Sequence, residues 1–409
     1  MRRRSFLGLA ATGVLTPAVA QAQAPARTRW VNTWTSMPQL CEPGNMPPPP
    51  FTQDGLVLAD ATLRQTVRVT VGGRRMRLRF SNAFGGAVLP ITAVTVALPQ
   101  DGRAGVSAVQ PATLQRVTFN GRSSADVPKG ALVVSDPLDF ALKPGTILTV
   151  TTYLARGQAS NDITSHPGSR TTSHLLAGNH AESADLPGAT PVDHWYFLSG
   201  IEVLSARPAL VVIGDSLTDG RGSTTNGNDR WPDRLADRLR GEVAVLNQAA
   251  GGNRVMNDGL GPSVLARLDR DLLAQSGVRW LILLEGVNDI GTAATTEAAQ
   301  KQVADDLIAA YQQIAERAHA HDIEVYGGTI LPFGGSFYDE GFREDARQTV
   351  NRWIRTSHHF DAVIDFDAAV RDPATPRQLL PVADVGDHLH LNPAGYRMLA
   401  EAVPLKLFR

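Results

Sequence analysis

Residues 207–217, Arg-Pro-Ala-Leu-Val-Val-Ile-Gly-Asp-Ser-Leu, indicate the fold class of the C-terminal half of this 409-residue chain. The apolar run from Ala209 to Ile213 has no alternation of polar and apolar residues, which is typical of a strand buried on both faces of a parallel sheet. Gly214 ends the run, and the chain is expected to turn tightly before Ser216. We therefore expect a strand, a turn and a helix start, which together open an α/β unit.

Strands and helices alternate after this stretch. Further apolar strands are expected at 243–246, 280–284, 323–326 and 362–366. Helices are expected at 232–240, 263–275, 296–320, 341–357 and from Pro393 onward. Apolar strands that alternate with helices predict an α/β domain with a parallel sheet covered on both faces.

The residues from about 30 to 200 have a different pattern. Residues 62–71 end at Gly72-Gly73, and residues 75–80 (Arg-Met-Arg-Leu-Arg-Phe) alternate polar and apolar, as a half-buried strand does. We predict a tight hairpin turn at Gly72-Gly73. Further short strands, separated by Gly, Pro, Asp and Asn, are expected at 91–98, 113–119, 131–134 and 147–154. This pattern predicts a β-sandwich or a jelly-roll-like domain.

The first 24 residues have the pattern of an export signal. Arg2, Arg3 and Arg4 precede an apolar stretch, and the small-residue pattern Ala-Gln-Ala-Gln-Ala follows at 20–24. The segment Arg-Arg-Ser-Phe-Leu at 3–7 also resembles the twin-arginine signature, which implies a bacterial protein exported to the periplasm or secreted. The alternative is a membrane anchor, for which the apolar stretch is short.

Three units are therefore expected along the chain. A cleaved signal peptide occupies residues 1–24, the all-β domain residues 25–205, and the α/β domain residues 206–409.

Composition excludes several kinds of partner. The 39 basic and 40 acidic residues leave a formal net charge of −1, so there is no basic excess to attract nucleic acid or an anionic membrane surface. No segment after the signal is apolar and long enough to span a membrane. Cys41 is the only cysteine, so no internal disulfide can form and stability must come from the apolar cores. The oligomeric state is left open.

Chemically useful side chains follow the strands of the predicted parallel sheet. In open α/β sheets, functional residues gather in the loops after the carboxyl ends of strands. Four such loops carry them: Gly214-Asp215-Ser216-Leu217, Asn-Gln-Ala-Ala-Gly-Gly-Asn at 247–253, Gly286-Val287-Asn288-Asp289 and Asp387-His388-Leu389-His390.

These loops, in this order, resemble the four sequence blocks of the SGNH/GDSL hydrolase family. The resemblance covers about 200 residues, which is the whole C-terminal half. It implies a flavodoxin-like parallel sheet and a serine ester hydrolase. The N-terminal half resembles, less sharply, the β-rich region that precedes this domain in some exported bacterial members.

The residue types agree with that chemistry. The hydroxyl of Ser216 needs a base to take its proton, and His390 can do this. Asp387, three residues before the histidine, can accept a hydrogen bond from its Nδ1–H and fix the tautomer. His388 is the alternative base, but it adjoins Asp387 and lacks the three-residue offset.

The resemblance assigns three oxyanion donors: the backbone N–H of Ser216, the backbone N–H of Gly252 and the side-chain amide of Asn288. A glycine allows close backbone approach to the substrate, and an amide donates without titrating. Other interpretations stay open. Ser216 could cap a helix, and Gly251 and Gly252 could be plain turn formers. Asp215 is interpreted as a supporting residue that holds the turn.

No cofactor or metal is expected. The remaining histidines have no recognised metal-ligand spacing, and we interpret them as surface or packing residues: His166, His174, His180, His194, His358 and His359.

The sequence thus predicts an exported serine esterase that acts on carboxylic esters. We favour short acyl esters, including acetyl groups on a polysaccharide. The alternatives are acyl transfer to a sugar hydroxyl, a lipase or arylesterase, and a non-catalytic glycan-binding protein.

Overall fold

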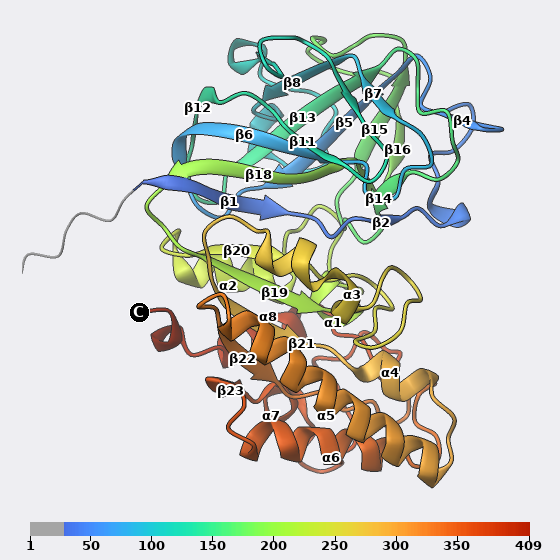
Figure 1. The fold of residues 1–409 in the computed structure, drawn as a ribbon, viewed down its shortest axis with the longest axis vertical. Helices are drawn as coiled ribbons and strands as arrows, with labels where there is room; N and C mark the ends of the chain where they lie inside the picture. The colour runs from blue at the N-terminus through green and yellow to red at the C-terminus, as the bar shows by residue number, and fades with distance from the viewer. Residues whose placement is uncertain (1–27) are drawn as a thin grey trace, which may run out of the picture.

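The structure is a computed structural model that describes residues 28–409. An antiparallel β-rich region comes first in the chain, and an α/β region with a parallel sheet follows it (Figure 1). The expected signal peptide lies outside the described residues.

Two antiparallel sheets form most of the β-rich region. The five-stranded sheet consists of β1 (Arg29–Thr35), β18 (Leu198–Ser205), β6 (Gly73–Ser81), β11 (Leu132–Val134) and β12 (Leu138–Leu142). The six-stranded sheet consists of β16 (Thr190–Val192), β15 (Ser173–Ala177), β5 (Ala61–Arg68), β13 (Ile147–Leu154), β8 (Ala93–Ala97) and β9 (Gln115–Val117). Alternate side chains of β6 (Met76, Leu78 and Phe80) are fully buried, as the sequence pattern predicts.

Smaller sheets complete this region. They are β17 (Trp195–Tyr196) with β14 (Thr164–His166) and β2 (Gln39–Leu40), β10 (Ala125–Val127) with β7 (Leu89–Ile91), and β3 (Thr52–Gln53) with β4 (Leu56–Val57). The sheet that contains β14 matters for the site, because this strand ends at His166, whose side chain contacts the α/β region.

The hairpin predicted at Gly72-Gly73 is wrong. β5 and β6, which flank these glycines, belong to different sheets and do not pair with each other. Val69 and Val71 between them are fully buried, and the Val69 N–H donates to Thr146 O at 3.0 Å. The chain crosses the core from one sheet to the other because these valines must be buried, whereas a surface turn would expose them.

The α/β region has a five-stranded parallel sheet in the order β20-β19-β21-β22-β23. Its strands are β19 (Ala209–Gly214), β20 (Ala244–Asn247), β21 (Val278–Leu284), β22 (Glu324–Gly328) and β23 (Ala362–Ile364). In chain order this is 2-1-3-4-5, the flavodoxin-like order, and the predicted fold class is confirmed. Strand order reverses at β19, so the loop after β19 lies where such folds place their ligands.

Eight α-helices accompany the sheet in the described part of the chain. They are α1 (Ser216–Asp219), α2 (Trp231–Leu239), α3 (Val264–Leu268), α4 (Val287–Thr292), α5 (Glu297–His319), α6 (Arg343–Thr356), α7 (Phe366–Val370) and α8 (Pro393–Ala402). Within residues 28–409, no helix combines the length and apolar character needed to cross a membrane.

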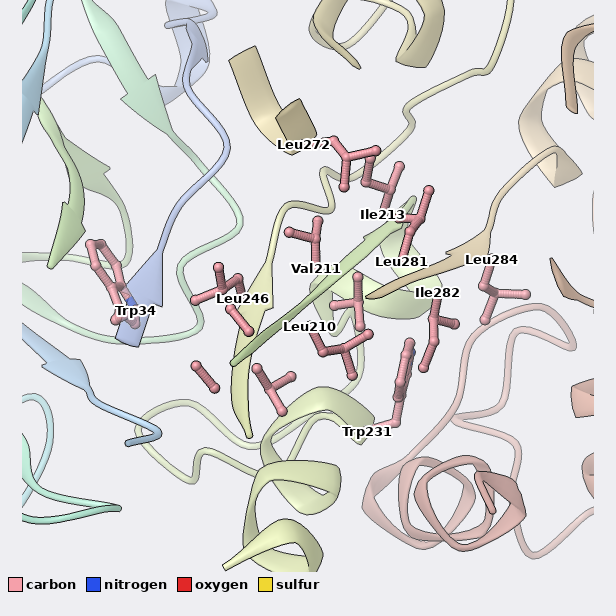
Figure 2. Close-up of a cluster of buried hydrophobic side chains, with 14 of the residues drawn as sticks. Trp34, Leu210, Val211, Ile213, Trp231, Leu246, Leu272, Leu281, Ile282 and Leu284 are labelled. Carbon is pink, nitrogen blue, oxygen red and sulfur yellow. The ribbon is translucent and has the colours of Figure 1, made fainter. Parts of the chain in front are cut away.

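The core is continuous around β19. Figure 2 shows Leu210, Val211 and Ile213 of this strand among apolar side chains from its neighbours, and all three are fully buried. The β-rich region packs against the same sheet. The Asn32 N–H of β1 donates to Ser276 O at 3.1 Å, and the Val245 N–H of β20 donates to Thr70 Oγ1 at 3.1 Å. The two regions are therefore joined by direct hydrogen bonds as well as by the chain.

Candidate active site

Ser216 is the first residue of α1 and follows β19 after a single turn residue. That turn residue, Asp215, is the N-cap, and its Oδ1 accepts a hydrogen bond from the Leu217 N–H at 2.8 Å. Because Asp215 caps the helix, the hydroxyl of Ser216 is left for another partner.

The hydrogen-bond partner of the Ser216 hydroxyl is His390, near the C-terminal end of the α/β region. Ser216 Oγ lies 2.8 Å from His390 Nε2, and His390 Nδ1 lies 2.7 Å from Asp387 Oδ2. Asp387 Oδ1 also accepts the backbone N–H groups of His390 at 2.8 Å and of Leu389 at 3.1 Å. The carboxylate is therefore fixed behind the ring, with the Nδ1–H directed at it and Nε2 free to accept from the serine.

His388, the alternative base, points elsewhere. Its Nδ1 pairs with Asp384 Oδ2 at 2.7 Å, and its side chain is 55% exposed. The positive φ of His388, 61°, turns it away from the direction of His390. The structure thus brings His390, and not His388, to Ser216.

The ionisation of His390 and Asp387 follows from their surroundings. Burial lowers the pKa of His390 below its ordinary value of 6.5; Asp387 opposes this shift, and the positive charges of Arg221 and Arg170 add to it. Partial burial disfavours the charged form of Asp387, but the hydrogen bonds from His390 and Leu389 hold the pKa of this carboxyl below its ordinary value. A neutral imidazole next to an ionised carboxylate is the state a general base needs.

The glycine turn lies beside the helix that Ser216 begins, since the Gly251 N–H donates to Asp219 Oδ2 at 3.0 Å. The Asn253 N–H donates to Ala250 O at 3.2 Å, which closes a turn with Gly251 and Gly252 at its centre. Gly252 has a φ of +69°, a conformation that strains any residue with a Cβ, and a Cβ here would also displace the side chain of Leu260. Within residues 28–409, no acceptor is found for the backbone N–H groups of Ser216 and Gly252. Both donors remain available to a ligand.

Asn288 is linked to the same turn. Its Nδ2 donates to Asn253 O at 2.9 Å, and its Oδ1 accepts from the Tyr338 hydroxyl at 3.0 Å. Asn253 is held in turn by Arg267, whose Nη2 lies 2.8 Å from Asn253 Oδ1. One N–H of the Asn288 amide is therefore used for positioning, and the second is left to donate.

Three buried acidic side chains, Asp215, Glu285 and Asp289, lie in or next to these loops. Burial raises the pKa of Asp215 to about 7, and it also raises the pKa of Asp289. Burial likewise raises the pKa of Glu285, and the negative charges of Asp215 and Asp289 add to this shift. Asp289 accepts the N–H groups of Val255 and Met256. Both carboxyl oxygens of Glu285 are buried without a hydrogen-bond partner among the described residues. Glu285 is therefore expected to be protonated in the folded protein.

Glu285→Gln is expected to change the pH dependence of stability. A carboxyl whose pKa is raised by folding stabilises the protein below its unfolded pKa, and this contribution is lost as the pH rises through the folded value. The Tm of the wild-type protein should therefore fall more between pH 5 and pH 8 than the Tm of Glu285→Gln, which carries no titrating group there. Thermal unfolding at both pH values measures this, with Glu297→Gln on the surface as the control. Equal pH dependence in the wild-type protein and Glu285→Gln would contradict the prediction.

Three residues near the site are missed by sequence reasoning: His166, Asp219 and Tyr338. The sequence pattern places His166 among the surface or packing residues; it is buried, as a packing residue is, and its Nε2 also lies 3.0 Å from Asp219 Oδ1. The position of Asp219, one turn after Ser216, is a signal that could have found it. For His166 and Tyr338 no local signal exists. Among the residues that the structure describes, no group of three or more His, Cys, Asp or Glu side chains is arranged to hold a metal ion.

Comparison with protein-family models finds one match, over the segment that carries these residues. Residues 212–398 match the model of the GDSL-like Lipase/Acylhydrolase family. This segment begins within β19 and ends within α8, so it contains Ser216, the glycine turn, Asn288 and the Asp387–His390 pair. No curated protein sequence is significantly similar to the chain.

Solved structures of this kind resemble about half of the chain. A carbohydrate acetylesterase from Sinorhizobium meliloti is 15% identical, and the match covers 49% of this chain and 98% of the esterase, with a TM-score of 0.39. An acetyl xylan esterase from Geobacillus stearothermophilus is 21% identical, and the match covers 48% of this chain and 92% of that esterase, with a TM-score of 0.36. A GDSL-like lipase from Bacteroides thetaiotaomicron is 17% identical, and the match covers 47% of this chain and 84% of the lipase, with a TM-score of 0.35.

Proposed function

The C-terminal half of the chain, through residues 212–398, belongs to the GDSL-like lipase/acylhydrolase family of ester hydrolases, and on this premise we propose that the chain hydrolyses short acyl esters through an acyl-enzyme on Ser216. The observation that carries the proposal is the continuous hydrogen-bonded chain from Ser216 Oγ through His390 to Asp387. It is the arrangement that a serine nucleophile requires.

Acylation uses each of these groups once. Ser216 Oγ attacks the ester carbonyl carbon while His390 Nε2 takes the hydroxyl proton, and Asp387 stabilises the resulting imidazolium. The negative charge that develops on the carbonyl oxygen is bound by the N–H groups of Ser216 and Gly252 and by the free N–H of Asn288. The imidazolium then protonates the departing alcohol, the ester C–O bond breaks, and the acyl group stays on Ser216.

Deacylation repeats the sequence with water. His390 takes a proton from a water molecule as its oxygen attacks the acyl carbon, and the same three donors bind the oxyanion. The imidazolium returns a proton to Ser216 Oγ as the acid leaves, which restores the starting state.

Exposed apolar side chains next to the proposed oxyanion donors support an ester carried on a sugar. Leu260, 52% exposed, borders Gly252, and Phe337, 68% exposed, packs against Tyr338, which holds Asn288. An exposed aromatic ring beside a polar site suits the apolar face of a sugar. We include acetyl groups on carbohydrate in the proposal for this reason.

The test is a panel of p-nitrophenyl esters from acetyl to long acyl chains, together with acetylated glycans, assayed with the purified protein. Turnover that is fastest with the short esters supports the proposal, and a preference for long chains would replace it with a lipase. Adding a sugar acceptor and measuring the acyl sugar formed separates hydrolysis from acyl transfer. No turnover with any ester would leave glycan binding as the function.

The pH profile is expected to reflect the surroundings of His390. The base acts only when neutral, and its pKa lies below 6.5, so kcat/KM should be level above pH 7 and fall on the acid side with an apparent pKa below 6.5. Arg221→Gln removes a positive charge that lowers the pKa of His390, so its acid limb should lie at higher pH than in the wild-type protein. An acid limb above pH 7 in the wild-type protein, or no movement in Arg221→Gln, would contradict this account.

We also propose that the protein acts in the periplasm or outside the cell, after removal of residues 1–24. The support is the arginine, apolar and Ala-x-Ala pattern of these residues. The mass of the protein recovered from the periplasm or the medium tests it, since cleavage would leave a chain that begins at Pro25 or close to it.

A further inference from the structure

A histidine of the β-rich region contacts the nucleophile's helix. His166, the last residue of β14, is 4% exposed, and its Nε2 lies 3.0 Å from Oδ1 of Asp219, which is 1% exposed. Asp219 ends α1, one turn after Ser216. The contact therefore joins the β-rich region directly to the short helix that begins with the nucleophile.

Both ring nitrogens of His166 face acceptors. Nδ1 lies 3.0 Å from the carbonyl oxygen of Met37, which can only accept, and Nε2 faces the carboxylate. An imidazole N–H can donate to either acceptor, so the ring is held between Met37 and Asp219. The Trp195 ring stacks on it at 5.8 Å between centroids and fixes its plane. His166 and Asp219 thus form a buried pair of polar side chains at hydrogen-bond distance.

The carboxylate is screened from water by the same segment. Burial alone would raise the pKa of Asp219, but His166, Arg170 and Arg230 together hold the pKa of this carboxyl below its ordinary value. A Cβ at Gly168 would lie 1.8 Å from Asp219 Oδ2, so the backbone two residues after His166 approaches the carboxylate as closely as glycine alone allows.

The second oxygen of Asp219 holds the glycine turn. Oδ2 accepts the N–H of Gly251 at 3.0 Å, and Gly251 precedes the oxyanion donor Gly252. The opposite side of the turn is held through Asn253 by Arg267. The direction of the Gly252 N–H is therefore set from two sides, by Asp219 and by Arg267.

We propose that His166 is a positioning residue for catalysis, which acts through Asp219 and Gly251 to aim the Gly252 N–H at the oxyanion. The β-rich region is then part of the catalytic unit and not an independent accessory. This inference rests on the proposed esterase function.

Two variants of His166 separate its contacts. In His166→Gln the amide can reach the place of Nε2 and still donate to Asp219, whereas in His166→Asn it ends near Nδ1 and donates only to Met37 O. His166→Asn is expected to lower kcat about 10²-fold with KM unchanged, because oxyanion contacts strengthen in the transition state. His166→Gln should retain more activity. The control is His194→Asn, whose Nδ1 bonds Pro167 O at 2.8 Å within the β-rich region, and wild-type kcat is expected there.

Asp219→Asn provides the same test from the α/β side, should His166→Asn fail to fold. It is expected to lower kcat by a similar factor, and the double variant should be no slower than the slower single variant, because both substitutions interrupt one chain of contacts. Additive losses in a double-mutant cycle, or equal kcat in His166→Asn and the wild-type protein, would overturn the inference.

The rate of labelling by a fluorophosphonate gives a readout that does not depend on the ester chosen. The probe bonds to Ser216 Oγ with loss of fluoride, and its phosphoryl oxygen occupies the oxyanion position. His166→Asn should be labelled about 10²-fold more slowly than the wild-type protein. Equal labelling rates would overturn only the role of His166. A wild-type protein that neither labels nor turns over any ester would instead contradict the esterase function itself, and this inference with it.

Discussion

Ser216→Ala is expected to lower kcat by about 10⁶-fold for every ester that the wild-type protein hydrolyses. The substitution removes the only atom that bonds to the acyl group, while the Gly252 and Asn288 donors stay in place. The residual rate then reports what the oxyanion donors and substrate binding contribute without the nucleophile. Burst kinetics with p-nitrophenyl acetate provide the measurement: the wild-type protein should show an acyl-enzyme burst and the variant none.

Ser223→Ala is the matched control for the nucleophile. Its hydroxyl donates to Gly220 O at 2.7 Å in the loop after α1, so its removal should leave kcat close to the wild-type value. Ser216→Ala should also unfold at a Tm equal to or above that of the wild-type protein, because residues at active sites are selected for reactivity rather than stability. Retained turnover in a folded Ser216→Ala protein would remove the assigned nucleophile.

Asp387→Asn is expected to lower kcat by about 10⁴-fold. The amide oxygen can still accept the backbone N–H groups of His390 and Leu389, so its NH₂ group is turned toward His390 Nδ1. That NH₂ donates to Nδ1 and leaves the proton on Nε2, where it blocks acceptance of the Ser216 proton. The measurement is kcat across pH 6 to 9, and the loss should persist throughout.

Asp384→Asn is the control that compares the two histidines. Asp384 pairs with His388 at the same 2.7 Å by which Asp387 pairs with His390, but His388 is exposed and does not reach Ser216. The Asp384→Asn substitution should therefore lower kcat far less than Asp387→Asn does. If Asp384→Asn proved the more damaging variant, the base would be His388 and the arrangement described above would be wrong.

Much of the fold could be predicted because it depends on local pattern. The unbroken apolar runs 209–213 in β19 and 280–284 in β21 require burial on both faces, and helices between the strands leave a parallel sheet as the stable arrangement. The alternation in β6 likewise requires one buried face. The placement of β5 and β6 in different sheets could not be predicted, because it is decided by where Val69 and Val71 are buried, and that depends on the second sheet.

The candidate site shows the same division. Ser216, Gly252, Asn288 and His390 could be named because each follows a predicted strand or precedes a predicted helix, where parallel strands gather their loops at one edge. Their residue types also limit the chemistry to a nucleophile, a base and uncharged donors. Asp387 could be named because only two residues separate it from His390.

By itself, then, the sequence determined the α/β architecture, the β-rich region before it and the residue types available to the site. Only the tertiary structure decided that His388 turns to Asp384, that Tyr338 holds Asn288, and that His166 crosses from the β-rich region to Asp219. The physical reason is that hydrophobic periodicity and turn chemistry act over a few residues. A buried hydrogen bond between residues 53 positions apart, such as His166 to Asp219, exists only where the two regions pack together and exclude water from between them.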